Sequence, residues 1–217
     1  SFENRLRFAL EIIQGIKQAC PGFPVSVRIS ADEFMPDGNS LQDGVKIAQA
    51  MVEAGADVIN VSNGLHESGV TIMEPYAYPE GWKKHLAKTI RAAISVPVIA
   101  VNTIKSPETA EALLEEGVSD FIGAGRSLLA DPDWPNKAKN GVPQTIRSCV
   151  GCMQCFSELA MGRHIGCAVN PRTGRELYFP APIRDRSGEC AVVVGGGPAG
   201  MEAAVTLARR GYHVTLF

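Results

Sequence analysis

The fold class follows from one passage of the chain, VPVIAVNTIKSPETAEALLEEGVSDFIGAGRSLLADPDW (residues 96–134). Its first part, VPVIAVNT (96–103), is a short apolar run that predicts a buried β-strand. SPETAEALLEEG (106–117) predicts a helix, because Ser106 can cap its N-terminus, Pro107 suits its first position and Gly117 can end it. SDFIGAGRSLLADPDW (119–134) predicts a further strand and its exit loop.

The same alternation extends over residues 1–140, with strands expected at 23–30 and 56–64 and helices at 3–19, 41–56 and 80–95. Strands that are apolar on both faces and alternate with helices indicate a parallel sheet, in a (β/α)8 barrel or a doubly wound fold. A closed barrel needs eight strands and about 250 residues, and only four strands are expected here. We therefore predict an α/β fold in which residues 1–140 form the C-terminal half of a (β/α)8 TIM barrel.

Four cysteines with the spacing C-x2-C-x2-C-x11-C follow, in SCVGCMQCFSELAMGRHIGCAVNP (148–171). Three thiolates on one tight loop, with a fourth returning after a helical excursion, are typical of iron–sulfur cluster ligands. Zinc is the second alternative, although four-cysteine zinc sites more often use two separated pairs, and disulfides are the third. We predict that Cys149, Cys152, Cys155 and Cys167 are metal ligands, and that Cys20 and Cys190 are buried thiols.

A linker rich in Pro and Arg (170–189) leads to ECAVVVGGGPAGMEAAVTLARRGYHVTLF (189–217). A glycine motif between a strand and a helix, inside a unit of about 30 residues, predicts dinucleotide binding. Gly195 permits a tight turn, Gly197 permits close approach of a pyrophosphate, and Gly200 lets the helix pack on the strand. The loop Gly195, Gly197, Pro198, Ala199 and Gly200 would then face phosphates; a glycine-rich turn without a ligand is the alternative.

Composition narrows the class of protein. The chain has 217 residues and a formal net charge of −2, which gives no electrostatic reason to expect nucleic acid or an anionic membrane as a partner. It lacks an apolar run of about 18 residues. Reduced cysteines fit the cytoplasm. Because the chain opens at Ser1 inside an apparent helix, we expect a fragment of a longer polypeptide.

Taken together, VRIS (27–30), NGLHES (63–68), GAGRSLLADPDW (123–134), the cysteine run and GGGPAG (195–200) resemble the iron–sulfur relatives of old yellow enzyme. These are the 2,4-dienoyl-CoA reductase and 2-enoate reductase type, with trimethylamine dehydrogenase as a cousin. The resemblance implies an FMN-bearing barrel (1–140), a 4Fe–4S cluster segment with its linker (141–188) and the truncated start of an FAD/NAD(P)-binding Rossmann-like domain (189–217).

The resemblance also implies the residues that bind FMN. Arg28 matches an arginine at the N1/O2 edge of the flavin ring, where a fixed cation stabilises reduced flavin; a surface ion pair is the alternative. Gly125 and Arg126 match the pair that holds the FMN phosphate, in agreement with the phosphate site that barrels build after strands seven and eight. Asn102 and Thr103 would complete this site, although Thr103 replaces an arginine of the dienoyl-CoA reductases.

His66 matches a histidine that helps to protonate the substrate, as an imidazole near neutral pH can; a solvated loop histidine is the alternative.

The resemblance implies a flavoprotein in which NAD(P)H reduces FAD, the cluster passes single electrons to FMN, and FMN delivers hydride to an activated C=C bond of a small-molecule enoate or enoyl thioester. Partners would be this substrate and a second copy in a homo-oligomer. The cysteine spacing instead resembles the amine dehydrogenase branch, which exports electrons through the cluster. A catalytically inert fragment is the third hypothesis.

Overall fold

The computed structural model describes residues 1–180 and 182–217. The chain divides into two compact units, Ser1–Pro171 and Arg172–Phe217, which are called unit 1 and unit 2 below. No helix in the described ranges combines the length and the apolar character needed to cross a membrane.

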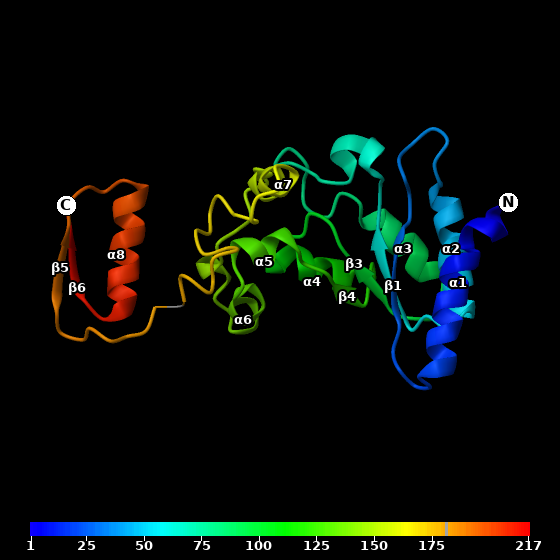
Figure 1. Ribbon diagram of the computed structural model, residues 1–217, viewed down its shortest axis with the longest axis horizontal. Coiled ribbons are helices and arrows are strands. Elements are labelled where there is room, and N and C mark those ends of the chain that lie inside the picture. Colours follow the sequence, from blue (N-terminus) through cyan, green and yellow to red (C-terminus); the bar gives the residue numbers. More distant parts are fainter. Residues whose placement is uncertain (181) are drawn as a thin grey trace. The chain divides into compact units, whose positions relative to one another are not determined.

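Unit 1 is built on a parallel four-stranded sheet in the order β1-β2-β3-β4 (Figure 1). The strands are β1 (Ser26–Ser30), β2 (Val58–Ser62), β3 (Val98–Ala100) and β4 (Phe121–Ile122). In the β1–β2 register, Arg28 lies opposite Asn60. The α/β class and the parallel sheet expected from the sequence are therefore confirmed.

Three helices, α2 (Leu41–Glu53), α3 (Lys84–Ala93) and α4 (Pro107–Glu115), connect successive strands of unit 1 and pack against the sheet. Ile59 and Val98 of the strands and Ile90 of α3 are completely buried, which places the core between sheet and helices. The elements are α1 (Phe2–Ala19), α2 (Leu41–Glu53), α3 (Lys84–Ala93), α4 (Pro107–Glu115), α5 (Arg126–Ala130), α6 (Trp134–Lys139) and α7 (Gln154–Ala160), with 3-10 turns η1 (His66–Thr71) and η2 (Pro143–Thr145).

Local sequence signals account for several helix ends. Ser106 caps α4 by accepting a hydrogen bond from the Thr109 amide at 3.2 Å, and Pro107 occupies the first turn. Gly117, at φ +64°, follows the end of the helix in the left-handed region, which suits glycine because it has no Cβ. The predicted capping of 106–117 is confirmed.

Two local predictions are wrong. The helix expected from residue 80 begins at Lys84, because Gly81 adopts φ +65° and the following residues turn inward. The exit loop expected after β4 contains the short helices α5 and α6. These helices are too short to show the periodicity that predicts a helix.

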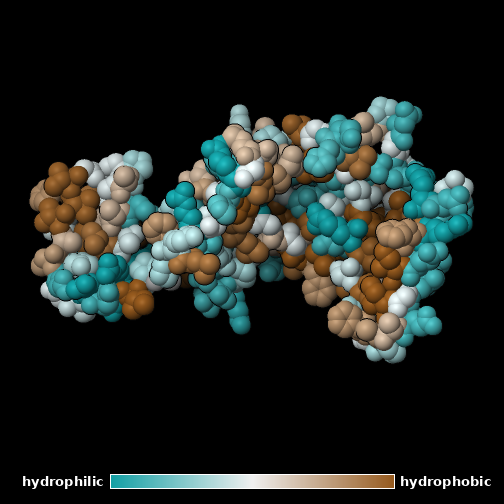
Figure 2. All heavy atoms as spheres, viewed as in Figure 1, coloured by the Kyte–Doolittle hydropathy of each residue, from teal (hydrophilic) through white to brown (hydrophobic). Residues whose placement is uncertain are grey.

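Unit 2 contains a strand–helix–strand arrangement, formed by β5 (Cys190–Val193), α8 (Pro198–Arg210) and β6 (His213–Leu216). Its two strands pair in parallel, as the sequence predicts. Figure 2 shows apolar side chains gathered at the ends of these strands, where Val194 and Phe217 are exposed.

The prediction that Cys20 and Cys190 are buried is wrong, since both are exposed. Cys20 lies just past the end of α1. Cys190 begins β5, where alternate side chains are exposed because the helix α8 packs against β5 and β6.

Candidate functional site

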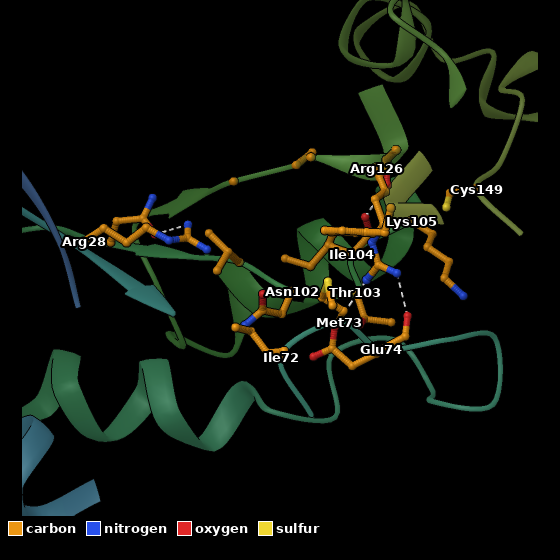
Figure 3. A pocket seen from close by; sticks show the side chains of 17 residues that line it. Arg28, Ile72, Met73, Glu74, Asn102, Thr103, Ile104, Lys105, Arg126 and Cys149 are labelled. Carbon is orange, nitrogen blue, oxygen red and sulfur yellow. Dashed lines mark hydrogen bonds and ion pairs between the residues drawn. The ribbon is translucent and has the colours of Figure 1, made fainter. Parts of the chain in front are cut away.

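A cavity of about 380 Å³ in unit 1 lies toward the carboxyl ends of the parallel strands. We call it the strand-end cavity; Figure 3 shows Arg28 at one end and Arg126, beside Glu74 and Cys149, at the other. In parallel α/β sheets this edge is where ligands bind. All five residues expected to bind FMN line this cavity: Arg28, Asn102, Thr103, Gly125 and Arg126.

Arg28 is fixed by the neighbouring strand β2. Its guanidinium donates hydrogen bonds to Asn60 Oδ1 at 2.9 Å and to Ser62 Oγ at 2.8 Å. Both acceptors are neutral, so the cation keeps its charge for a ligand in the cavity. The alternative of a surface ion pair is not seen in the described part of the chain, where Arg28 contacts these polar groups instead.

The chain turns sharply after β3. Asn102 and Thr103 adopt φ of +79° and +47°, in a left-handed region that residues other than glycine rarely occupy and that often marks functional sites. The buried Thr103 hydroxyl has no hydrogen-bond partner among the described residues. The side chains of Asn102 and Thr103 line the cavity, and their backbone is strained there.

The residues after β4 leave room for a ligand. A Cβ built on Gly125 would meet no atom within 4 Å, so this side of the cavity wall is open. Arg126 follows directly, and its side chain lines the same cavity. An open backbone beside a guanidinium can hold an anionic group such as the phosphate of FMN.

A buried charged group behind Arg126 was missed by sequence reasoning. The side chains of Glu74 and Lys83 are 1% and 3% exposed and form an ion pair. Glu74 also binds Arg126, whose Nη2 donates to Glu74 Oε2 at 3.2 Å and whose Nη1 donates to the Glu74 carbonyl at 2.5 Å. Glu74 lies between Met73 and Pro75, outside any periodic segment. The sequence around it therefore shows only a carboxylate with apolar neighbours and does not predict an ion pair.

The four candidate ligand cysteines line a second, smaller cavity of unit 1, together with Arg126 and Leu129. The loop 149–167, called the cysteine loop, bends at Gly151 and Met153, with φ of +67° and +63°. Gly151 lies against the backbone of Tyr76, whose amide donates to the Gly151 carbonyl at 3.1 Å. A Cβ on Gly151 would lie 2.8 Å from that amide nitrogen, so the contact requires glycine.

The donor set of this second cavity is consistent with an iron–sulfur cluster. All four cysteines are free thiols, so the disulfide alternative is not seen. Burial raises the pKa of the Cys155 thiol. In residues 1–180 and 182–217, no group of three or more His, Cys, Asp or Glu side chains is arranged to hold a single metal ion. Four sulfurs around one cavity nevertheless fit the all-thiolate ligand set of a cluster.

The two cavities share part of their lining. Cys149 and Arg126 line both, and Arg126 Nη1 also lies 3.3 Å from Met153 Sδ in the cysteine loop. A group in the strand-end cavity and a group held by the cysteines would therefore lie close to the same guanidinium.

His66 does not join these residues. It is the first residue of η1, it is exposed, and it is not part of the lining described for the strand-end cavity. It does follow β2 at the carboxyl edge of the sheet, and its role as a proton donor stays a prediction.

In unit 2, the glycine loop 195–200 has the geometry of a tight strand-to-helix turn. Gly195 adopts φ +111°, and a Cβ on Gly200 would lie 1.8 Å from the Gly195 carbonyl oxygen. A Cβ on Gly197 would meet no atom within 4 Å, so the loop is open before the N-terminus of α8. Such a turn can hold phosphates through backbone amides; nucleotide binding itself stays a prediction.

Comparison with known proteins places this geometry in context. Residues 1–145 match the NADH:flavin oxidoreductase / NADH oxidase family. Residues 190–217 match the glucose inhibited division protein A family. The first match covers unit 1 up to the cysteine loop, and the second covers the strand–helix–strand arrangement of unit 2.

Individual relatives extend over the whole chain. It is 45% identical to an NADH oxidase of Thermoanaerobacter brockii, over 100% of this chain and 34% of the relative. Among solved structures, 2-naphthoyl-CoA reductase superposes with a TM-score of 0.90 at 32% identity, over 100% of this chain and 33% of that one. Histamine dehydrogenase from Rhizobium sp. 4-9 gives a TM-score of 0.87 at 32% identity, over 100% of this chain and 32% of that one. The chain thus spans about a third of the length of these relatives.

Proposed function

The chain belongs to the NADH:flavin oxidoreductase / NADH oxidase family, and we propose that it forms the FMN-binding and cluster-binding part of an enzyme that reduces activated C=C bonds with NAD(P)H. One observation carries the proposal: the five residues expected to bind FMN, which come from β1 and from the segments after β3 and β4, line a single cavity. The similarity to 2-naphthoyl-CoA reductase over the whole chain supports an enoyl thioester or enoate as the substrate.

The residues of the strand-end cavity have distinct roles in this proposal. Arg28, held by β2, would bind the polar edge of the flavin ring and stabilise negative charge there. Gly125 and Arg126 would bind the phosphate, the former through open backbone and the latter through its guanidinium. Asn102 and Thr103 would complete the wall. Bound FMN would supply hydride transfer, which no side chain of the chain can perform.

The cysteine loop and unit 2 would serve electron supply. Cys149, Cys152, Cys155 and Cys167 would hold a 4Fe–4S cluster, which supplies one-electron steps between two flavins. The glycine loop 195–200 would bind the pyrophosphate of FAD or NAD(P)H through backbone amides at the start of α8. Under this proposal residues 1–140 are the C-terminal half of a (β/α)8 barrel, 141–188 the cluster segment and linker, and 189–217 the beginning of a Rossmann-like domain.

His66 is the proposed proton donor. It follows β2 at the carboxyl edge of the sheet, and an imidazole can donate a proton near neutral pH. Its exposure requires that the segment 65–72 bring the ring toward the substrate when one binds.

An amine dehydrogenase is the second candidate. It is favoured by the C-x2-C-x2-C spacing of the cysteine loop and by the similarity to histamine dehydrogenase. In that case the same flavin site would oxidise an amine, and electrons would leave through the cluster to a carrier protein.

Anaerobic assays of the full natural polypeptide separate these functions. The proposal predicts NADH- or NADPH-dependent reduction of 2-enoates or enoyl thioesters, together with bound FMN, iron and acid-labile sulfide. Amine-dependent reduction of a dye without NAD(P)H would support the second candidate instead. Protein that binds no flavin would contradict both.

A further inference from the structure

Behind the strand-end cavity lies a chain of buried polar side chains that joins two of its walls. Lys83 Nζ donates to Asn63 Oδ1 at 2.6 Å, and Asn102 Nδ2 donates to the same oxygen. Lys83 also pairs with Glu74, and Glu74 in turn accepts from Arg126 at 3.2 Å. Asn102 after β3 and Arg126 after β4 are therefore connected through Asn63, Lys83 and Glu74.

Lys83 has the surroundings of a charged ammonium group. Its nitrogen contacts Glu74, Asn63 Oδ1 and the Thr71 carbonyl, which gives three oxygen acceptors for the three N–H donors of an ammonium group. Its Nζ lies 4.7 Å from the centroid of the Trp82 ring and 5.8 Å from that of Phe34. The rings favour a cation. Burial and the nearby Arg126 lower the pKa of Lys83, and the contact with Glu74 acts against that shift.

The charges of this group do not cancel. One carboxylate, Glu74, faces two cations, Lys83 and Arg126, so one positive charge remains in a wall where water screens little. Only Arg126 of these cations lines the strand-end cavity. Without Lys83, the carboxylate of Glu74 would neutralise Arg126 directly.

We propose that Lys83 and Glu74 are positioning residues for the strand-end cavity: Glu74 holds the Arg126 guanidinium in place, while Lys83 neutralises Glu74 so that Arg126 keeps its charge for the anionic phosphate of a ligand. The inference rests on the proposed function, because the anion is taken to be the phosphate of FMN. It assigns a role to two residues that lie outside every motif of the sequence.

The alternative is that the Glu74–Lys83 pair only stabilises the fold. The two roles make opposite predictions for a double substitution. Replacing Lys83 alone leaves Glu74 and Arg126 with no net charge. Replacing both members, as Glu74→Gln with Lys83→Met, restores the single positive charge of the original group and keeps a hydrogen-bond acceptor for Arg126.

The test compares two ligands on flavin-free full natural polypeptide, by fluorescence titration at about pH 8. FMN carries the phosphate and riboflavin lacks it. Lys83→Met should weaken FMN binding about tenfold, as the loss of a close charge pair does, and should change riboflavin binding by less than about twofold. The double variant should recover most of the FMN affinity. Lys84→Met, which removes an exposed cation that pairs with Glu116, is the matched control and should leave both affinities unchanged.

Equal losses of FMN and riboflavin binding in Lys83→Met, or a double variant as weak as the single one, would overturn the inference. If Lys83→Met does not fold, the double variant decides alone, since it must still prefer FMN over riboflavin as strongly as the unaltered protein does. An unaltered protein that binds both flavins equally would contradict the proposed phosphate site itself. If Lys83→Met prefers FMN over riboflavin as strongly as the unaltered protein does, the role of Lys83 is contradicted, while the proposed phosphate site stands.

Discussion

The strand-end cavity of unit 1 presents two guanidinium groups to a ligand, whereas the glycine loop of unit 2 presents backbone. In the first, these are Arg28 and Arg126, and Lys105 adds a third cationic residue to the lining. In the second, the backbone at Gly195 and Gly197 borders open space where side chains would otherwise lie. A backbone site is determined by a few consecutive residues, because it consists of glycines and the N-terminus of the helix that follows them. A side-chain site depends on partners far along the chain, such as Glu74 for Arg126, and its behaviour should respond to distant substitutions.

The cysteine loop is the extreme case of a side-chain site, because the proposed ligand atoms are themselves side-chain sulfurs. Cys152→Ser should remove nearly all of the iron and acid-labile sulfide from anaerobically prepared protein, which we expect to hold about four irons per chain. Iron analysis measures the effect. Cys20→Ser is the matched control, since Cys20 is exposed outside the loop and its loss should leave the iron content unchanged. Full iron content in Cys152→Ser would remove that residue from the ligand set.

Arg126→Ala tests the strand-end cavity. We expect FMN affinity to fall about 100-fold, because a charge-assisted contact to phosphate is lost and Glu74 is left paired with Lys83 alone. Calorimetric titration with FMN and with riboflavin measures the effect, and riboflavin affinity should change far less. A similar loss for both ligands would show that Arg126 supports the wall of the cavity rather than the phosphate.

Gly200→Ala tests the backbone site. The new Cβ would lie 1.8 Å from the Gly195 carbonyl oxygen, so the strand and helix of unit 2 must separate, at a cost of about 3 kcal/mol. Hydrogen–deuterium exchange of β5 and α8 would report the loss of stability. Gly196→Ala is the control, because a Cβ there would meet no atom within 4 Å. Equal exchange in the two variants would disprove the close helix–strand contact.

The smallest effect is expected for a substitution at Asp131, whose carboxylate accepts a hydrogen bond from the Arg147 amide just before the cysteine loop. Burial alone would raise the pKa of Asp131, but hydrogen bonds from Lys137 and from the amides of Arg147 and Asp133 hold this pKa below its ordinary value of 3.8. The ionised carboxylate therefore stabilises the fold above about pH 4, and this contribution is lost as the pH falls through the lower, folded pKa.

Asp131→Asn should accordingly lower the stability by about 1 kcal/mol at neutral pH. Melting curves at neutral pH and near pH 3 measure the change, and the difference from the unaltered protein should narrow at the lower pH. Asp133→Asn, at a neighbouring carboxylate that accepts a hydrogen bond from Asn136 in an exposed position, provides the control. A difference that does not depend on pH would show that the charge of Asp131 is irrelevant to stability.

Much of the architecture is readable from local sequence. The caps at Ser106 and Gly117 and the glycines of 195–200 act over a few residues, so their consequences could be predicted. Apolar runs likewise located all four strands of unit 1. The start of α3 could not be predicted, because the turn at Gly81 and the inward direction of Lys83 depend on a buried partner, Glu74, in another segment.

The candidate site divides in the same way. Arg28, Asn102, Thr103, Gly125 and Arg126 were located by motif, and the structure brings them to one cavity. Glu74 and Lys83 belong to no motif, and their pairing arises only when the segments that carry them fold together. The strained backbone at Asn102 could not be predicted from the sequence either, because the surrounding structure maintains it.

A crystal structure of the full natural polypeptide loaded with FMN tests the central claim most directly. The account predicts the phosphate within hydrogen-bond distance of the Arg126 guanidinium and the Gly125 backbone, with the flavin ring edge beside Arg28. A phosphate bound elsewhere, with Arg126 still paired to Glu74 and facing no ligand, would contradict it.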